Sequence, residues 1–427
     1  MRKHWKLVVY LLAFLILAVT LAACQPLKGM TAPPDEVCRY LVPQYIYSHG
    51  SIPTGLEEEI RIPSYGFSYA LYNAFPYIVM GLAMRVTGLF TQAPGALLLT
   101  ARMVNVLAGL AMAWTVYLLS RRLFEKERSR WLFCLAVTFQ PMNIFVHSYV
   151  NTDSFCMLST ALIVYGLVRL YQEKPDLKSC LWIAAGVILC ALSYYSAYGY
   201  ILAAVILFIA AFARKGAFDF PGFLKYAGIT AGIVLAGIGW WFIRQYMVLD
   251  GDFLGLRTRA ALTAAYGKPA VQAANTFAGQ GYSFFGMLKE MLARRLPVKL
   301  AGTLIAAYGS LTLKPGIWYY ALYGLVWLAG LAGLILKACR ENRPHGTIFH
   351  GCMVLCMVLP LLLYLRYCYA TDYQEQGRYL LPALVPAMYY VTKGLERWGK
   401  AAAVCAGTVI VFCAVWQVYA VALPAFL

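Results

Sequence analysis

The length, composition and charge of the chain place it in a membrane. Of its 427 residues, 62% are hydrophobic and 13% are charged, whereas soluble domains have about 25% charged residues. The formal net charge of +18 is distributed over short segments between long apolar runs. This distribution argues against nucleic acid as a partner and makes the lipid bilayer the expected one.

Apolar runs of bilayer length recur along the whole chain. A transmembrane helix needs about 17 to 25 predominantly apolar residues. The sequence therefore predicts an all-α, polytopic membrane protein of about 11 transmembrane helices, built as one integral-membrane domain over residues 1–427. The expected spans are residues 5–24, 96–119, 131–146, 155–171, 181–195, 200–212, 223–243, 318–336, 348–364, 379–391 and 401–423.

The first apolar run has two interpretations. Residues 21–24, Leu-Ala-Ala-Cys, follow a basic start and resemble a lipoprotein cleavage site. We expect instead that residues 5–24 remain as the first membrane helix, because the rest of the chain needs an anchored start. The twelve cysteines show no metal-site spacing and mostly lie in apolar runs, so neither a disulfide framework nor a zinc site is predicted.

Basic residues predict the orientation of the helices. The turns 147–151 and 194–199 contain no Lys or Arg. More than half of the Lys and Arg residues lie on the other side, before the first span or in residues 121–130, 173–178, 214–225, 337–343 and 393–400. By the positive-inside rule that side is cytoplasmic. The amino terminus is then cytoplasmic, and the first long loop, residues 25–95, faces outward.

Residues 65–90 are apolar and long enough to cross the membrane. Counting them as a span would place the basic segment 121–130 outside, against the charge rule. We therefore expect a juxtamembrane or re-entrant helix within the first outer loop.

A Pro-Pro-Asp-Glu sequence at residues 33–36 follows the first span. The two prolines hold the approaching backbone extended and so aim the carboxylates behind them. Asp35 is a candidate general base or a ligand for a divalent cation, and Glu36 beside it is a further catalytic candidate. The alternative for Asp35 is a helix N-cap. His49 and the acidic run 57–59 are expected to be solvated loop side chains.

Two later segments add polar candidates on the same outer face. Asp153 opens a predicted helix, where it serves either as a cap or as a second catalytic carboxylate. Arg378 follows Gly377 at the outer end of a span. A guanidinium there can grip a phosphate with two parallel hydrogen bonds, or simply extend to the membrane surface.

The outer segment 244–316 is strongly basic. It predicts a cationic surface for an anionic headgroup or a polyprenyl phosphate, the alternative being a loop kept soluble against lipid headgroups. Its acidic residues are Asp250, Asp252 and Glu290. Its basic residues are Arg244, Arg257, Arg259, Lys268, Lys289, Arg294, Arg295, Lys299 and Lys314.

Four segments, taken in their order and sidedness, resemble the GT-C class of polytopic glycosyltransferases, which includes protein O-mannosyltransferases and bacterial aminoarabinose transferases. They are PPDEVCRY at 33–40, SYGFSYALYNAFPY at 64–77, VNTDS at 150–154 and QGRYLLPALVP at 376–386. They look still more like a poorly characterised bacterial membrane family within that class, which has a Pro-Pro-Asp-Glu motif after the first helix. That family shows a histidine three positions after the glutamate, where this chain has Arg39.

The resemblance implies a multi-pass transferase of the bacterial cell membrane. It would take a sugar from a polyprenyl-phosphate donor on the extracytoplasmic side, for an acceptor in a cell-envelope glycan, lipid or protein. The acidic motif of such enzymes is the catalytic or metal-binding site, here Asp35 and less certainly Glu36, with Asp153 as the second acid. A divalent cation at Asp35 is the one optional cofactor. The residues expected to contact substrate are Arg39, Tyr40, Arg294, Arg295, Gln376, Arg378 and Tyr379.

A transporter or flippase of lipid-linked saccharides is the alternative function, because it too needs polar groups in the membrane and basic phosphate contacts. Transporters usually show internal repeats and broken helices near the midplane. This sequence shows no such symmetry, and its candidate residues lie on one face of the membrane. The sequence therefore favours a glycosyltransferase.

Overall fold

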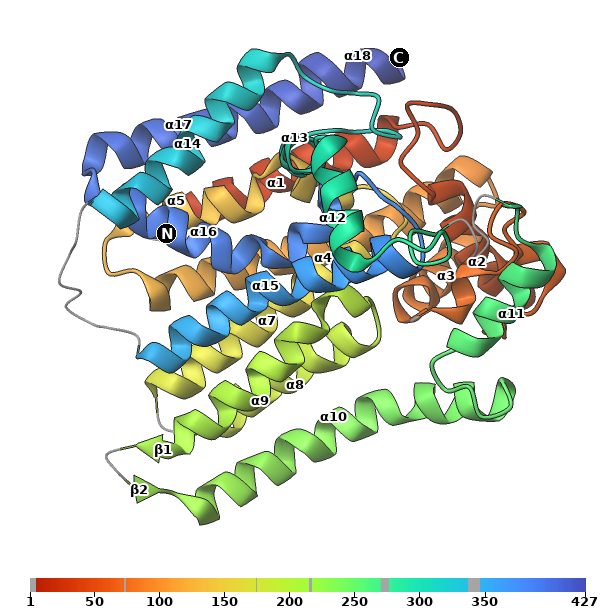
Figure 1. Ribbon diagram of the computed structural model, residues 1–427, viewed down its shortest axis with the longest axis horizontal. Coiled ribbons are helices and arrows are strands. Elements are labelled where there is room, and N and C mark those ends of the chain that lie inside the picture. The colour runs from red at the N-terminus through yellow and green to blue at the C-terminus, as the bar shows by residue number, and fades with distance from the viewer. Residues whose placement is uncertain (1–4, 73, 174, 215–216, 270–275, 337–345) are drawn as a thin grey trace.

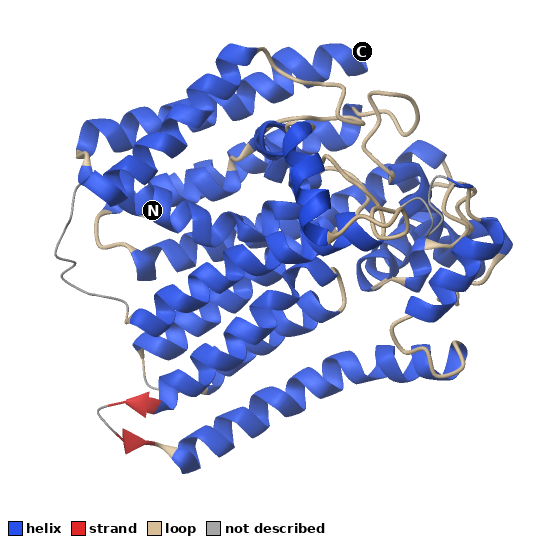
Figure 2. Cartoon of the chain, viewed as in Figure 1, coloured by secondary structure: helices blue, strands red, loops and turns tan. Residues whose placement is uncertain are grey.

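Long α-helices form a bundle, and a cluster of short helices covers one of its ends (Figure 1). The computed structural model describes residues 5–72, 74–173, 175–214, 217–269, 276–336 and 346–427. Within these ranges the only strands are the antiparallel pair β1 (Ala213–Arg214) and β2 (Ala217–Phe218), drawn in red in Figure 2. The all-α prediction is confirmed.

Groups of longer and shorter helices follow one another along the chain. The longer ones are α1 (Trp5–Cys24), α4 (Pro94–Leu123), α7 (Asp153–Gln172), α8 (Leu177–Ala191), α9 (Tyr198–Phe212), α10 (Phe220–Val248), α14 (Ile317–Leu336), α15 (Thr347–Ala370) and α17 (Lys400–Trp416). The shorter ones are α2 (Glu36–His49), α3 (Phe75–Gly88), α5 (Glu127–Thr138), α6 (Pro141–Val146), α11 (Leu256–Tyr266), α12 (Phe284–Ala293), α13 (Leu296–Ile305), α16 (Leu384–Arg397) and α18 (Leu423–Phe426). The 3₁₀ segments are η1 (Glu58–Ile60), η2 (Tyr69–Leu71), η3 (Tyr195–Ala197) and η6 (Gly377–Ala383), and η7 (Gln417–Ala422) is π-helical.

Eight helices of the described residues are long and apolar enough to cross a membrane. They are α1, α4, α7, η3 with α9, α10, α14, α15 and the continuous run from α17 to α18. The prediction of a multi-pass membrane protein is confirmed, but the expected count of about 11 spans is not. The expected outer segment 244–316 also begins inside α10, which continues to Val248.

The expected span 131–146 is divided between α5 and α6. Gln140 caps α6, and its side-chain oxygen accepts a hydrogen bond from the backbone N–H of Asn143 at 2.6 Å. Pro141 follows in the first turn of α6. Proline cannot donate the backbone bond that would continue α5, but it suits the first turn of a new helix. The break redirects the chain before the segment that ends at Asp153.

Helices α7 and α8 form a closely packed hairpin that fixes the position of Asp153 at its open end. A Cβ added to Gly166 of α7 would lie 2.7 Å from Cγ1 of Ile183, and one added to Gly186 of α8 would lie 2.7 Å from Cγ1 of Ile163. Each glycine therefore packs directly against an isoleucine side chain of the other helix. Small residues at helix contacts allow this close approach in membrane proteins.

The expected juxtamembrane segment 65–90 contains η2 and α3. Helix α3 has 14 residues, which at about 1.5 Å per residue is too short for a hydrocarbon core of about 30 Å. It packs against α2 and α4, and these contacts place it in the cluster of short helices at the right-hand end in Figure 1. This agrees with the expectation that residues 65–90 do not cross the membrane as a helix.

Candidate active site

A cavity of about 510 Å³ lies at the end of the bundle covered by α2, η2 and α11. Its walls come from segments far apart in the sequence: the start of α2, residues 65–77, η3, α11 and the end of α15. Aromatic side chains and charged groups share the lining. The charged residues are Asp35, Arg39, Arg259, Arg366 and Asp372. The aromatic residues are Tyr65, Phe67, Tyr69, Tyr72, Tyr77, Tyr194, Tyr195, Tyr364, Tyr367 and Tyr379.

Asp35 is the N-cap residue of α2, but its carboxylate does not cap the helix. Its backbone has φ 61° and ψ 2°, a left-handed conformation that is uncommon outside glycine and that clusters at functional sites. The side chain is 28% exposed and lines the cavity. The N-cap alternative therefore holds for its backbone position, while the carboxylate is directed to other partners.

Arg378 joins the two predicted acids. Its Nη2 donates to Oδ2 of Asp35 at 3.3 Å, and its Nη1 lies 4.0 Å from Oδ2 of Asp153. Nη1 also donates to the hydroxyl of Tyr149 at 2.7 Å. The Arg378 side chain is only 4% exposed. Residues 35, 153 and 378, separated widely in the sequence, thus form one cluster, in which Asp35 lines the cavity and the buried Arg378 and Asp153 lie behind it.

Asp153 is the first residue of α7, where the helix dipole favours a negative charge. It is 5% exposed. Its Oδ2 has no hydrogen-bond partner among the residues that the structure describes, and the guanidinium of Arg378 is the ion-pair contact it makes there. Asp153 and Asp35 therefore together compensate the positive charge of Arg378.

Glu36 lies beside Asp35 in sequence but is fully buried away from the cavity. Its oxygens accept hydrogen bonds from Nη2 of Arg102 at 2.6 Å, from Nε of Arg102 at 2.9 Å and from the N–H of Val150 at 2.8 Å. Arg102 further donates to the carbonyls of Ala22 and Gln25. The network ties α1, α2, α4 and the turn before α7 together. The structure thus places Glu36 in a buried network outside the cavity, apart from its neighbour Asp35, which lines the cavity.

Arg39 and Tyr40, which were both expected to contact substrate, differ in whether they line the cavity. Arg39 lines the cavity, donates to the Tyr77 hydroxyl at 3.1 Å and stacks 4.7 Å from the ring centre of Tyr69. Tyr40 points into an apolar cluster around α2 and α3 and does not line the cavity. Burial, with the charge of Glu36 adding to it, raises the pKa of Tyr40 to about 12. Of these two residues, only Arg39 lines the cavity.

Tyr379 and Gln376, two further predicted substrate contacts, also differ in whether they line the cavity. Tyr379 lines the cavity, with its ring 5.9 Å from the ring of Tyr367. Gln376 donates to the side-chain oxygen of Gln374 at 2.8 Å, and Gln374 is the residue that reaches the cavity. Gln376 therefore contacts a residue of the cavity wall but does not itself line the cavity.

Arg294 and Arg295 lie outside the cavity, contrary to their expected role as substrate contacts. Arg294 pairs with Glu290 one helical turn earlier, at 2.7 Å. Arg295 is the positive-φ residue, φ 55°, between α12 and α13. The correction follows from the path of the loop, because α11 and not α12 or α13 covers the cavity.

Three charged residues of the cavity were missed as individual site candidates: Arg259, Arg366 and Asp372. Arg259 was one of nine basic residues in an undivided segment. Asp372 accepts a hydrogen bond from Gln374. Burial, together with the charge of Asp35, raises its pKa above the usual value. A carboxylate in the outer segment that follows the apolar run 348–364 was the available signal for Asp372.

The donor set around Asp35 does not fit a divalent cation. No group of three or more His, Cys, Asp or Glu side chains that could hold a metal occurs in the described ranges. The guanidinium of Arg378 lies between the carboxylates of Asp35 and Asp153, where a metal ion would need to be to bridge them. The expectation that Asp35 binds a metal is not supported by this arrangement.

Solved structures with the same arrangement of helices are membrane glycosyltransferases. The oligosaccharyltransferase of Archaeoglobus fulgidus, tethered to an acceptor peptide, gives a TM-score of 0.57 at 14% identity over 99% of this chain and 55% of its own. AglB of the same organism, in complex with an inhibitory peptide and a dolichol-phosphate, gives 0.56 at 14% over 100% and 56%. ArnT from Cupriavidus metallidurans, bound to undecaprenyl phosphate, gives 0.54 at 12% over 92% and 61%.

The protein therefore has the GT-C fold, as the four sequence segments predicted. It spans a little over half the length of each of these structures. Within this class, the chain belongs to the DUF2142 family of predicted membrane proteins, whose model matches residues 57–387. The matched region includes Asp153 and Arg378 and begins after Asp35. A search of curated proteins gives no match.

Proposed function

We propose that the protein is a membrane glycosyltransferase that moves a sugar from a polyprenyl-phosphate donor to an acceptor on the extracytoplasmic side. The observation that carries the proposal is the cluster of Asp35, Arg378 and Asp153 at an aromatic cavity of a GT-C fold. The structures that share this fold were solved with dolichol-phosphate, undecaprenyl phosphate or an acceptor peptide. Aromatic walls of this kind suit the apolar faces of sugar rings.

The extracytoplasmic location rests on the charge rule and gains support from the arrangement of the bundle. Basic residues of the expected cytoplasmic side meet in space: Lys6 pairs with Glu127 at 2.6 Å, and Lys126 pairs with Glu396 at 3.1 Å. In Figure 1 this end of the bundle lies opposite α2, α3 and α11. The cavity thus lies at the end opposite the basic loops of the expected cytoplasmic side, which supports the proposed location.

In the proposed reaction, a hydroxyl or amine of the acceptor attacks the anomeric carbon of the donor sugar. The bond from that carbon to the phosphate oxygen breaks, and its electron pair stays on the phosphate. Asp35 accepts the proton of the attacking group, since its carboxylate is open to the cavity. A phosphate already leaves well, so positioning and charge compensation supply most of the acceleration.

Arg378 orients the base in this scheme. Its guanidinium holds one oxygen of Asp35, while Tyr149 and Asp153 fix the guanidinium itself. Because the arginine is buried and engaged by three groups, it acts on the substrate through Asp35. Arg378 was expected to bind the donor phosphate directly. In this scheme, other cationic residues of the cavity bind the phosphate instead.

The proposal is tested with purified protein in proteoliposomes that contain undecaprenyl-phosphate sugars and a cell-envelope extract as acceptor. Release of undecaprenyl phosphate is measured. Wild-type protein and the Glu59→Gln control, changed at an exposed acid of the same loop, are expected to release it at equal rates. Asp35→Asn is expected to reduce release by about 100-fold, the usual scale for loss of a general base. Release by Asp35→Asn at the wild-type rate would overturn the assignment.

A further inference from the structure

Two arginines of the cavity stand apart from the acid cluster. Arg259 of α11 is half-buried, and its guanidinium stacks on aromatic rings, 4.8 Å from the ring centre of Tyr72 and 5.9 Å from that of Phe67. Arg366 of α15 is exposed. Both line the cavity. Among the residues that the structure describes, neither forms an ion pair with a carboxylate. They differ in this from Arg378 and Arg102, whose charges are already balanced. Arg39 also lines the cavity without an ion pair among the described residues, but it is only 7% exposed and donates to the Tyr77 hydroxyl.

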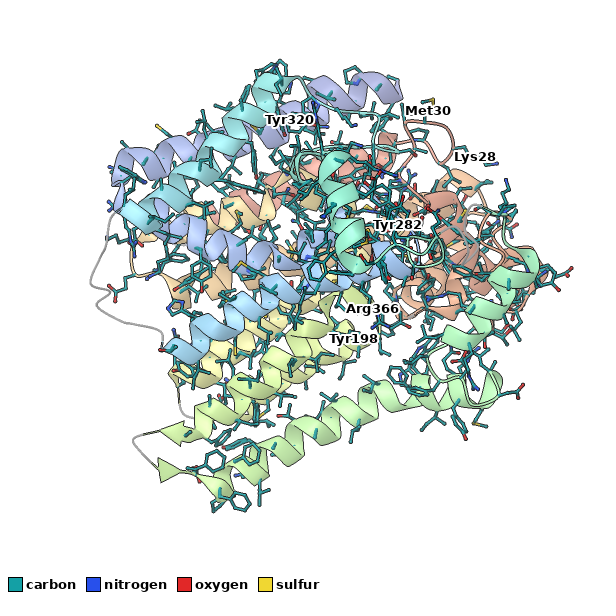
Figure 3. All side chains as sticks on the ribbon, viewed as in Figure 1. Lys28, Met30, Tyr198, Tyr282, Tyr320 and Arg366 are labelled. Carbon is teal, nitrogen blue, oxygen red and sulfur yellow. The ribbon has the colours of Figure 1, made fainter. Side chains whose placement is uncertain are left out.

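A chain of contacts relates the walls that carry these two arginines. Tyr72, beneath Arg259, lies 6.3 Å from the ring of Tyr195 in η3. The turn η3 in turn packs against α15, the helix of Arg366. Helix α9, which begins at Tyr198 directly after η3, also packs against α15; Arg366 and Tyr198 are labelled in Figure 3. Both cationic groups therefore border the same polar and aromatic cavity.

Arg366 also ends an apolar face of α15. Val354, Val358 and Leu362 follow one another at intervals of four residues and are 46%, 41% and 49% exposed. Residues four apart lie on one side of a helix, so Arg366 continues this stripe. An exposed apolar stripe on a membrane helix faces lipid. An amphiphile in the bilayer can therefore bring a phosphate to Arg366 while its tail remains beside the stripe.

We propose that Arg259 and Arg366 together bind the phosphate of the lipid-linked donor, and that Arg378 does not. The assignment rests on the proposed transferase function for the identity of the ligand. A guanidinium presents two parallel N–H donors to a phosphate. When the sugar leaves, the phosphate diester becomes a monoester and gains one negative charge. Two arginines with no carboxylate partner are suited to compensate for that charge, because no internal ion pair has to break first.

The test is a binding titration of detergent-purified protein with undecaprenyl phosphate, followed by native mass spectrometry. Arg259→Gln and Arg366→Gln are each expected to weaken binding by about tenfold or more, the scale of one charge-assisted hydrogen bond, and the double variant more than either. Arg257→Gln is the matched control, because Arg257 is an exposed arginine of the same helix that donates to the carbonyl of Asp250. It is expected to bind as wild type does. Equal thermal melting of all variants confirms that they fold.

Three further ligands identify what the arginines recognise. Undecaprenol, which has no phosphate, is expected to bind equally to wild type and to the double variant. Inorganic phosphate and phosphatidylglycerol are expected to bind at least tenfold more weakly than undecaprenyl phosphate. If phosphatidylglycerol bound as tightly and with the same dependence on arginine, the site would be a general headgroup site and the donor assignment would be wrong. Unchanged binding of undecaprenyl phosphate to the double variant would overturn the proposal outright.

The same variants separate this inference from the proposed function. Arginine-dependent binding without any sugar transfer would leave the phosphate site standing and reject the transferase. Transfer that depends on Asp35 but is unaffected by Arg259→Gln and Arg366→Gln would support the transferase and reject the phosphate site. Agreement requires loss of both binding and transfer in the arginine variants.

Discussion

Asp35 and Glu36 are adjacent, and each faces an arginine, yet their surroundings are opposite. Glu36 and Arg102 are fully buried, with both carboxylate oxygens occupied by the guanidinium and by the N–H of Val150. Asp35 shares Arg378 with Asp153 at longer distances of 3.3 and 4.0 Å, and more than a quarter of its side chain is exposed. Both oxygens of Glu36 thus have partners, whereas the carboxylate of Asp35 can still accept a hydrogen bond from a molecule in the cavity.

We infer from this difference that Glu36 serves the stability of the fold and Asp35 serves the chemistry. A buried charge that loses its partner is costly, because the remaining charge is left without water or counter-ion. A carboxylate that is held from one side and open on the other can exchange a proton with a substrate. The first network anchors Glu36 directly beside Asp35, whose backbone is left-handed at the edge of the cavity.

The largest effect is expected from breaking the pair of Glu36 and Arg102. Arg102→Ala should lower the free energy of unfolding by about 3 to 5 kcal/mol, since it leaves Glu36 buried and unpaired. Thermal or denaturant unfolding in detergent measures this. Arg122→Ala, which removes the partner of Glu173 in a more exposed pair, should cost about 0 to 1 kcal/mol. Equal losses in the two variants would contradict the distinction.

Arg378→Gln should act mainly on turnover. Loss of the group that orients Asp35 is expected to lower kcat about 100-fold while KM for the donor changes little, because Arg378 does not contact the donor in this account. Arg378→Lys should be intermediate, as one ammonium group cannot serve Asp35, Tyr149 and Asp153 together. The control is Arg397→Gln, changed at an arginine that binds the carbonyls of Gly333 and Leu334. A rise in KM with unchanged kcat would instead indicate direct donor contact.

Asp372 offers a smaller, pH-dependent effect. Burial and the charge of Asp35 raise its pKa in the folded protein above the ordinary value, so its ionised form destabilises the fold. The penalty is absent below the unfolded pKa and grows as the pH rises through the folded one. Asp372→Asn should therefore melt like wild type near pH 3 and at a higher temperature at neutral pH. A difference that shrinks with rising pH would reverse the sign and refute this reading.

Chelation should have the smallest effect. Because Arg378 lies where a bridging cation would have to be, transfer in excess EDTA is expected to proceed within about twofold of the untreated rate. A Mn²⁺ titration of wild-type protein should show no site that depends on Asp35. Loss of transfer in EDTA that returns on adding Mg²⁺ or Mn²⁺ would contradict this arrangement.

The sequence predicted the parts of this protein that depend on local pattern. Apolar runs located the long helices, because burial in lipid requires them, and the PPDE motif identified Asp35. Breaks within apolar runs were harder to predict. Pro141 was a signal for the division of 131–146, but a proline inside a membrane helix is tolerated often enough that it does not decide the matter.

The division of labour between the carboxylates depended on distant residues. Arg102 lies inside an apolar run, where an ionisable residue needs a partner, but the sequence does not say that the partner is Glu36, 66 positions earlier. Likewise, nothing local distinguishes Arg259 from Arg294 in the basic segment. Their roles follow from which helix covers the cavity, and that is a property of the three-dimensional path of the chain.

The central claim is that Asp35 performs chemistry while Glu36 maintains the fold, and one paired measurement tests it directly. Sugar transfer per folded molecule and melting temperature are determined for Asp35→Asn and Glu36→Gln in the same preparation. We expect Asp35→Asn to melt within a few degrees of wild type but to transfer sugar about 100-fold more slowly. We expect Glu36→Gln to be strongly destabilised while its folded fraction keeps most of its activity. Folded Asp35→Asn protein that transfers sugar at the wild-type rate would contradict the central claim.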